Sequence, residues 1–469
     1  MTVRKFEMEN FGQENMEKNS SNRNQMHYEF HAPQDHLKAD ARKNDRSKHE
    51  ESRRSEGGKK ASGGHSRSES RKKASGERSQ SESREKASGG QRLCRISRKC
   101  GGCAYLDLTY EEQLRKKHGY VRKMLGEGID VHPVAGMAHP FHYRNKVSAA
   151  FQRHRDGKIV SGIYEEGTHH VIPVTSCLIE DEKADEIINT IRGLLPSFRI
   201  PVYDEDRGSG LLRHVLVRVG KTSGEVLVVL VCASPVFPSK NNFVRVLRRR
   251  HPEITSVVLN INDRRTSMVL GTRNIVLYGK GYIEDTLCGR IFRISPTSFY
   301  QINPVQTEVL YRKAVDLARL TGAERVFDAY SGIGTIGIIA SSAAGSVTSV
   351  ELNGAAVRDA AVNARRNGIK NITFYEDDAG DFLEKSTAGG EHFDVIFMDP
   401  PRTGSTEKFI HAAAGASPSR IVYISCEPET LGRDLRIFRR EGYAAKEAWP
   451  VDMFPWTRST ECICLLGRK

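Results

Sequence analysis

Short apolar runs rich in Val, Ile and Leu recur between Val134 and Ile291, and polar or glycine-containing stretches separate them. Runs of this length and composition predict strands. A longer stretch with helical periodicity, Asp181–Leu195, interrupts them. The pattern therefore predicts a mixed α/β domain, with strands at Lys146–Phe151, Lys158–Tyr164, His214–Val219, Val226–Cys232, Ser256–Ile261 and Asn274–Tyr278.

The pattern changes after Ser298, where short buried-type strands alternate with helix-like segments. Such alternation is typical of an α/β doubly wound parallel sheet of the Rossmann type. The predicted strands are Arg325–Ala329, Ser346–Glu351, Ile372–Glu376, Asp394–Met398 and Arg420–Ser425.

The first 93 residues lack both patterns and are rich in Ser, Lys, Arg, Glu and Gly. A thirteen-residue repeat begins at Lys59, Lys72 and Glu85, and it has no apolar positions that could stack. We expect a disordered mixed-charge tail, which either touches phosphates loosely or only aids solubility. The expected organisation is a tail over 1–93, a central domain over 94–295 and a second domain over 296–469.

Charge narrows the range of partners. The formal net charge is +14, and the excess is shared by the tail and the remainder of the chain. A basic chain favours a polyanion such as nucleic acid, although a basic surface without a partner remains open. Candidate phosphate contacts are Arg144, Lys146, Arg153 and Arg155, although a residue of this kind is more often an ordinary surface charge than a phosphate contact.

The expected cellular compartment follows from the lack of sequence signals for membrane insertion or secretion. No apolar run reaches the roughly 20 residues that cross a bilayer, and the N-terminus lacks the apolar centre of a signal peptide. An odd number of cysteines, nine, does not suggest a secreted disulfide framework. We expect a cytoplasmic protein with no membrane contact, and we infer no obligate protein partner, so a monomer.

A glycine turn opens the second domain. Gly332, Gly334 and Gly337 give the spacing G-x-G-x-x-G after a predicted strand, and Glu351 ends the next strand. These features suit NAD and S-adenosylmethionine equally. Asp399-Pro-Pro-Arg402, after a later strand, is an acid-Pro-Pro turn of the kind that methyltransferases carry beside the transferred methyl group. The combination favours a methyltransferase over a dinucleotide enzyme.

Two further residues could carry chemistry. Cys426 follows a predicted strand and precedes a Pro, so it is a candidate nucleophile or a small core residue. Glu461 precedes the apolar run Cys462–Leu466, so it is a candidate base or an exposed charge.

Taken in order, five segments resemble the RNA uracil-C5 methyltransferase family over roughly Cys94 to the C-terminus. They are Ser298-Phe-Tyr-Gln-Ile-Asn303, Asp328-Ala-Tyr-Ser-Gly-Ile-Gly-Thr335, Asp399-Pro-Pro-Arg-Thr-Gly404, Ser425-Cys-Glu-Pro-Glu-Thr430 and Asp452-Met-Phe-Pro-Trp-Thr457 with Glu461.

The resemblance implies a role for individual residues. Cys426 matches the nucleophile and Glu461 the general base, while the residues matching the S-adenosylmethionine site are Gln301, Tyr330, Glu351 and Asp399. Asp378 resembles an adenine-side contact. Two positions depart from the family pattern, because Glu427 replaces a usual Asn and Ser459 a common His.

Three thiols gather before the central domain, in Cys94-x5-Cys100-Gly-Gly-Cys103, and Cys177 could supply a fourth. Four cysteines can bind zinc or an iron–sulfur cluster, and a three-plus-one layout favours [4Fe–4S]. Zinc and unliganded thiols remain open. By resemblance to the family, these four cysteines bind a [4Fe–4S] cluster.

The resemblance implies methylation of uridine C5 in RNA, with 23S ribosomal RNA favoured and the transfer RNA T-loop as the alternative. Two other classes remain open. One is a catalytically inactive RNA-binding protein on this fold, against which the pairing of Cys426 with Glu461 argues. The other is an amino-group methyltransferase, which would have no need of Cys426.

Overall fold

The computed structural model describes residues 4–6 and 93–469. The tandem repeats and almost all of the expected tail lie outside these residues. Within the expected tail, Arg4–Phe6 form a short strand, β1, that pairs antiparallel with β14. Since β14 is otherwise the last strand at its edge of a sheet, it offers free backbone groups to any extended segment. No helix in the described ranges is long and apolar enough to cross a membrane.

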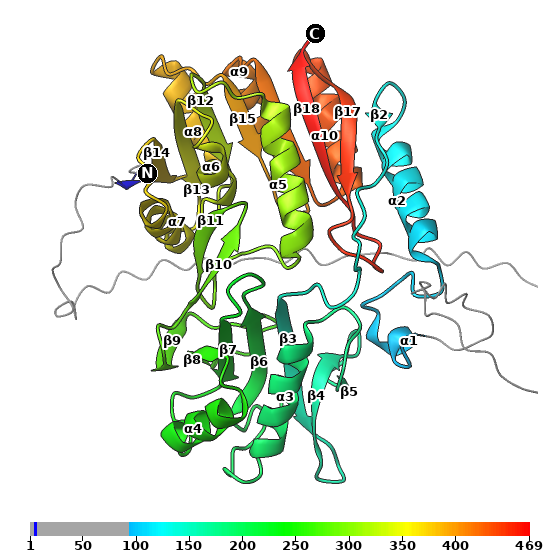
Figure 1. Ribbon diagram of the computed structural model, residues 1–469, viewed down its shortest axis with the longest axis vertical. Helices are drawn as coiled ribbons and strands as arrows, with labels where there is room; N and C mark the ends of the chain where they lie inside the picture. The colour runs from blue at the N-terminus through cyan, green and yellow to red at the C-terminus, as the bar shows by residue number, and fades with distance from the viewer. Residues whose placement is uncertain (1–3, 7–92) are drawn as a thin grey trace, which may run out of the picture. The chain divides into compact units, whose positions relative to one another are not determined.

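The central sheet confirms the predicted strands to within a few residues. Its strand order is β5-β4-β3-β6-β7-β8-β9, and only the β7–β8 pair is parallel. Helix α3 packs against β3, β4 and β6, while α4 packs against β9 (Figure 1). The elements are β3 (Lys146–Arg153), β4 (Ile159–Tyr164), β5 (Val171–Pro173), α3 (Glu182–Leu194), β6 (Leu212–Val219), β7 (Val226–Cys232), α4 (Lys240–Arg250), β8 (Ile254–Ile261) and β9 (Arg273–Tyr278).

A second sheet has the order β1-β14-β13-β12-β15-β16-β18-β17-β2. Strands β14, β13, β12, β15 and β16 are parallel to one another, as predicted. The sheet contains β2 (Asp130–Val131), β12 (Arg325–Ala329), β13 (Ser346–Glu351), β14 (Ile372–Glu376), β15 (Val395–Met398), β16 (Arg420–Ser425), β17 (Tyr443–Val451) and β18 (Glu461–Arg468).

Helices accompany this second sheet and complete the α/β pattern. They are α5 (Pro304–Ala318), α6 (Thr335–Ala340), α7 (Gly354–Arg366), α8 (Ala379–Ala388), α9 (Glu407–Gly415) and α10 (Pro428–Arg440). The remaining elements are α1 (Ser97–Cys100), α2 (Tyr110–Leu125) and the hairpin of β10 (Ile283–Leu287) with β11 (Arg290–Ile294). Helix α2 packs on α10.

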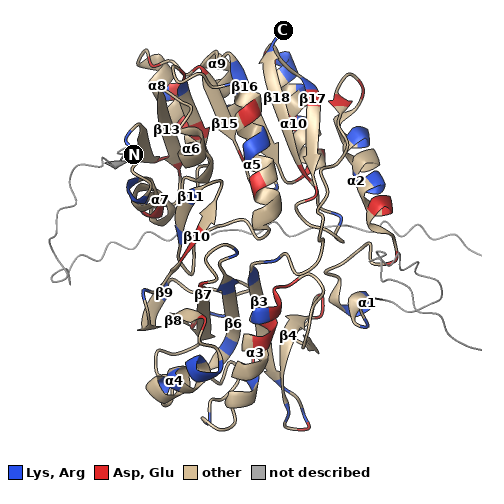
Figure 2. Ribbon diagram, in the orientation of Figure 1, with Lys and Arg blue, Asp and Glu red and all other residues tan. Residues whose placement is uncertain are grey.

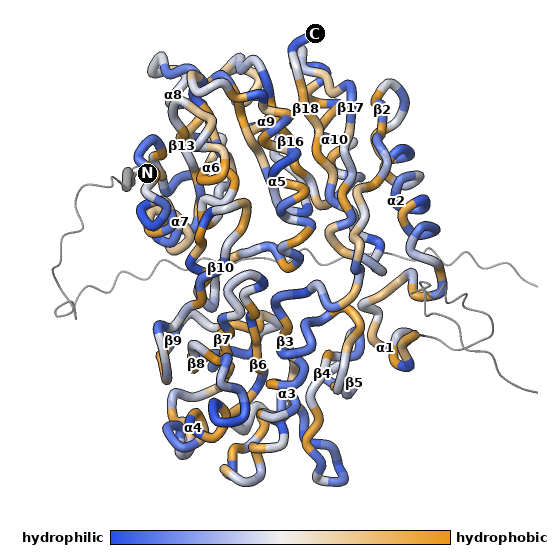
Figure 3. The backbone as a smooth tube through the Cα atoms, in the orientation of Figure 1, coloured by the Kyte–Doolittle hydropathy of each residue, from blue (hydrophilic) through white to orange (hydrophobic). Residues whose placement is uncertain are grey.

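One apolar core joins the parts. It contains Leu227 and Val258 of the central sheet, Phe292 of the hairpin and Leu310 of α5. Figure 3 shows the hydrophobic stretches along the strands, whereas α2 and α4 are largely hydrophilic. The described residues accordingly belong to a single compact unit, and the domain boundary expected at 295/296 stays a prediction.

Candidate active site

The predicted cofactor residues meet at one edge of the second sheet. Parallel pairing places Ala329 beside Met398, and Met398 beside Tyr423. Tyr330 and Asp399 directly follow the first two of these positions, and Glu351 ends the neighbouring strand β13. Ligands of open α/β sheets bind at this carboxyl edge.

The glycine turn is built for close backbone approach. Gly332 and Gly334 have φ of 56° and 78°, which side-chain-bearing residues rarely adopt. A Cβ on Gly337 would lie 2.6 Å from Oδ2 of Asp328. That oxygen accepts a hydrogen bond from the Gly337 amide at 3.0 Å, so only glycine fits there.

Glu351 is held against the same turn. Its Oε2 accepts from the Gly332 amide at 3.0 Å, and its Oε1 accepts from the Asn353 amide at 2.8 Å. Each carboxylate oxygen can accept a further bond, so the pair remains able to bind two ribose hydroxyls.

Tyr330 and Gln301 are fixed by neighbours. Tyr330 has a left-handed backbone, φ 60°, and its hydroxyl lies 3.2 Å from that of Ser405. Gln301 is 9% exposed, and its carbonyl accepts from the Asn145 side chain at 3.2 Å. Asp378 caps the N-terminus of α8 by accepting from the backbone amides of Gly380 and Asp381. This is a structural role, and the predicted contact with adenine stays a prediction.

Strand register brings the two predicted catalytic residues together. β16 and β18 are antiparallel, and Ser425 lies opposite Cys462. Cys426 directly follows Ser425 and Glu461 directly precedes Cys462, so the two residues lie at the same end of this strand pair, and the charge of Glu461 acts on the Cys426 thiol. These residues are 35 positions apart in sequence, yet the sheet makes them neighbours.

The electrostatics of the pair are those of a buried acid cluster. Burial, followed by the charges of Glu461 and Asp399, raises the pKa of the Cys426 thiol to about 12, and Arg402 opposes this rise. Glu461 is 2% exposed and its Oε2 has no hydrogen-bond partner. Burial, then the charge of Asp399, raises the pKa of Glu461 well above its usual value.

Asp399 joins this cluster. Burial, followed by the charge of Asp328, raises its pKa to about 7. A thiol and two buried carboxyls therefore act electrostatically on one another, and the exposed Arg402 guanidinium opposes them. Residues that sequence reasoning missed are Arg402 and the buried Tyr311 of α5, whose pKa burial and Asp399 raise. Only the Asp-Pro-Pro-Arg turn signalled Arg402.

The segment leading to Glu461 is anchored by α2. Lys117, fully buried, donates to Asp452 Oδ1 at 2.5 Å and to the Phe454 carbonyl at 3.0 Å. Tyr110 donates to Asp452 Oδ2 at 2.9 Å, and Gln113 accepts from the Trp456 amide at 2.8 Å. This anchor was not predicted, because α2 lies more than 300 residues away in sequence.

The four predicted cluster cysteines are all free and half-buried. Burial raises the pKa of Cys103 to about 11, and the charges of Cys100 and Cys94 act on it as well. Burial also raises the pKa of Cys177, to about 12. Cys103 and Cys177 pack on one apolar cluster with Tyr143 and Trp456.

The thiol donor set thus fits a soft metal or an iron–sulfur cluster. Across residues 93–469, however, no three such side chains already surround one metal position. The cluster therefore stays a prediction.

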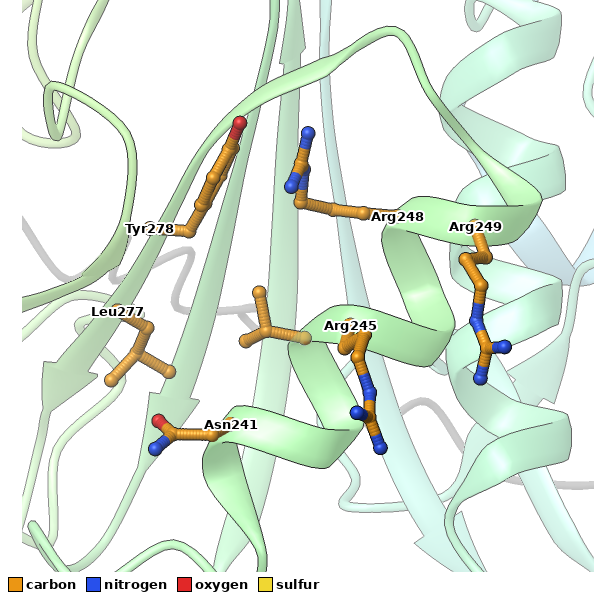
Figure 4. Close-up of a pocket in the computed structure, with 7 residues that line it drawn as sticks. Asn241, Arg245, Arg248, Arg249, Leu277 and Tyr278 are labelled. Carbon is orange, nitrogen blue, oxygen red and sulfur yellow. The ribbon is translucent and has the colours of Figure 1, made fainter.

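A second feature lies on the central domain. A hollow of about 350 Å³ between α4 and β9 is lined by Asn241, Val244, Arg245, Arg248, Arg249, Leu277 and Tyr278. Figure 4 shows Arg248 lying against Tyr278, with 3.6 Å from guanidinium carbon to ring centroid. Figure 2 shows basic residues along α4 and β6. The lining includes none of the predicted catalytic residues.

Known proteins resemble this chain over most of its length. The tRNA (uracil-5-)-methyltransferase family model matches residues 109–469. An uncharacterized RNA methyltransferase of Halalkalibacterium halodurans is 40% identical, covering 80% of this chain and 83% of that protein. One from Caldanaerobacter subterraneus subsp. tengcongensis is 42% identical, covering 80% and 84%.

A solved structure agrees with these matches. It is the Pyrococcus abyssi tRNA (uracil-54, C5)-methyltransferase in complex with S-adenosyl-L-homocysteine. It is 27% identical, covers 78% of this chain and 85% of its own, and has a TM-score of 0.66.

Proposed function

This chain belongs to the tRNA (uracil-5-)-methyltransferase family and is an S-adenosylmethionine-dependent RNA methyltransferase, and we propose that it methylates C5 of a uridine through a covalent Cys426 adduct. The observation that carries the proposal is the register of β16 and β18, which places Cys426 and Glu461 at the same end of the strand pair, where the charge of Glu461 acts on the Cys426 thiol. An amino-group methyltransferase needs neither residue, and an inactive RNA-binding protein has no reason to keep both.

The proposed mechanism uses Cys426 as the nucleophile and Glu461 as the general base. The Cys426 thiolate adds to C6 of uracil, and the C5–C6 π electrons move onto the C4 carbonyl to give an enolate. C5 then attacks the methyl group of S-adenosylmethionine, the sulfur–methyl bond breaks, and S-adenosylhomocysteine leaves. Glu461 removes the C5 proton, the C5–C6 double bond re-forms, and the C6–sulfur bond breaks to release the thiolate.

The raised pKa of Glu461 suits this step. A carboxylate without a cationic partner in a dry site is a stronger base than a solvated one, so it can accept a proton from carbon. Arg402, which lowers the pKa of both Cys426 and Glu461, would favour the charged forms that the reaction needs.

The favoured substrate is 23S ribosomal RNA, and the reaction would take place in the cytoplasm. The four-cysteine set Cys94, Cys100, Cys103 and Cys177 supports this choice through the family resemblance, and we propose that these residues hold a [4Fe–4S] cluster. Such a cluster would stiffen the loop that contains Cys100 and Cys103. This loop contacts the segment before Glu461, because the backbone amides of Ala104 and Tyr105 donate to the Trp456 carbonyl. The Pyrococcus structure supports the alternative, a transfer RNA uridine.

The test is transfer of tritiated methyl groups to total RNA from a strain that lacks the protein. We expect label in 5-methyluridine of 23S RNA. Label in transfer RNA would keep the chemistry and change the substrate, whereas label in another nucleoside would refute the proposal.

The nucleophile is tested separately. Cys426→Ala should lower methyl transfer by about 10⁴-fold or more, because removal of a nucleophile leaves only binding effects. Binding of S-adenosylmethionine, measured by calorimetry, should persist in this variant. Ordinary turnover by Cys426→Ala would exclude the covalent mechanism.

A further inference from the structure

Two cationic residues lie side by side on adjacent strands of the central sheet. Lys146 is the first residue of β3, and the antiparallel register places it directly opposite Arg218 of β6. Directly opposed residues project on the same face, and like charges in that position destabilise a sheet. The free protein therefore bears an electrostatic cost at this point.

Burial makes the cost larger. Arg218 is 4% exposed, and its Nε has no hydrogen-bond partner, although another guanidinium nitrogen donates to the Ser298 carbonyl. Burial, followed by the charges of Arg218 and Arg144, lowers the pKa of Lys146 to about 8. Within the described part of the chain, neither Lys146 nor Arg218 forms an ion pair with a carboxylate.

The pair adjoins the candidate active site. Asn145, next to Lys146, donates from its side chain to the Gln301 carbonyl and from its amide to the Ile302 carbonyl. Arg218 reaches the same segment at Ser298. Phe299, between these contacts in sequence, is 67% exposed, and Lys146 is only partly buried, so solvent reaches this region at the lysine.

We propose that Lys146 and Arg218 bind a backbone phosphate of the RNA strand that enters the active site. A phosphate between two cations satisfies the unpartnered donor and removes their repulsion. The arginines of α4 differ, because Arg245 and Arg249 are exposed and remain hydrated without an anion. The identification of the anion as RNA rests on the proposed function. The inference that Lys146 and Arg218 bind an anion rests only on their pairing and on the unpartnered Arg218 Nε.

The experiment replaces Lys146 with Met and measures binding of a fluorescein-labelled RNA hairpin with an unpaired uridine over a range of salt concentrations. We expect the affinity to fall by about tenfold and the salt slope to fall by about one. Lys158→Met is the matched control, because it removes the same charge from a side chain that is 81% exposed on the same domain. Its slope should match that of the wild type.

Stability supplies an independent readout. Lys146→Met should melt at a higher temperature than the wild type without RNA, because it removes the repulsion with Arg218. Lys146→Arg should keep the RNA affinity. A merely structural lysine would give the opposite sign in the melting experiment, and that result would overturn the proposal.

Two other results would also overturn it. One is an unchanged RNA affinity and salt slope in Lys146→Met. The other is unchanged RNA binding with weaker binding of S-adenosylmethionine, which would assign the anion to the cofactor carboxylate. Because these are binding measurements, they remain distinct from a failure of the wild type to form 5-methyluridine.

Discussion

Two buried carboxylates lie at either end of the segment 452–461, and their surroundings are opposite. Asp452 accepts from Lys117 and Tyr110, so both of its oxygens are satisfied and its charge is neutralised. Glu461 has one oxygen without a partner, and its close neighbours are Asp399 and the Cys426 thiol. Arg402 alone opposes the effect of these neighbours on Glu461.

This difference in surroundings distinguishes a structural carboxylate from a candidate general base. A carboxylate that is paired with a buried lysine fixes the backbone around it. A carboxylate that burial leaves uncompensated has a raised pKa and is a stronger base, which is what a general base requires. Asp452 therefore anchors one end of the segment, whereas Glu461 is placed to take part in the reaction at the other end.

The largest expected effect breaks the reactive end. Glu461→Gln should lower turnover by about 10²–10⁴-fold and should accumulate a covalent protein–RNA adduct, because the C5 proton no longer leaves. The adduct is measured as a shifted band on a denaturing gel. Asp452→Asn is the matched control, and it should form no adduct. Free product release by Glu461→Gln would remove Glu461 from the proposed role.

The next effect breaks the anchored end. Lys117→Met should lower the free energy of unfolding by about 3–5 kcal/mol, because it leaves the Asp452 charge buried without its cation. The double variant Lys117→Met/Asp452→Leu should recover part of that loss. Chemical denaturation measures both, and a double variant no more stable than the single one would contradict a charge-pair role.

A pH experiment sharpens the comparison. Burial raises the pKa of Asp399 from 3.8 to about 7, so the folded state holds a proton that the unfolded state releases. Stability from this group is present below the unfolded pKa and is lost as pH rises toward the folded value. The melting temperature should therefore fall between about pH 4 and pH 7, and less steeply in Glu461→Gln, which has one fewer titrating carboxyl. Parallel curves for the two proteins would contradict coupling of Asp399 with Glu461.

The smallest effect concerns Glu427, which departs from the family pattern. Glu461, Asp399 and Arg402 act on the Cys426 thiol, whereas Glu427 interacts with Glu429, Arg402 and Tyr120. Glu427→Asn should change kcat/KM by less than about fivefold. A larger gain would show that Glu427 restrains the thiolate after all.

Local pattern predicted most strands of both sheets. Strands β12, β13, β14 and β16 have the predicted bounds, since short Val- and Ile-rich runs between turns have few other stable arrangements. The helix predicted at Asp181–Leu195 is α3, capped by the Asp181 side chain. Local pattern did not predict strand β17 or helix α2. Each is stabilised by packing or pairing with another element, α2 with the distant α10 and β17 with β18.

The sequence by itself determined the residue types, the order of the motifs and the family, because these are properties of the chain read locally. Only the tertiary structure decided which charges are compensated. Glu461 and Asp452 look alike in sequence, yet Lys117 of α2 reaches one and not the other. Lys146 and Arg218 become a strained pair only through the β3–β6 register. Burial and pairing are long-range properties, and they set the free energy of a charge far more than its identity does.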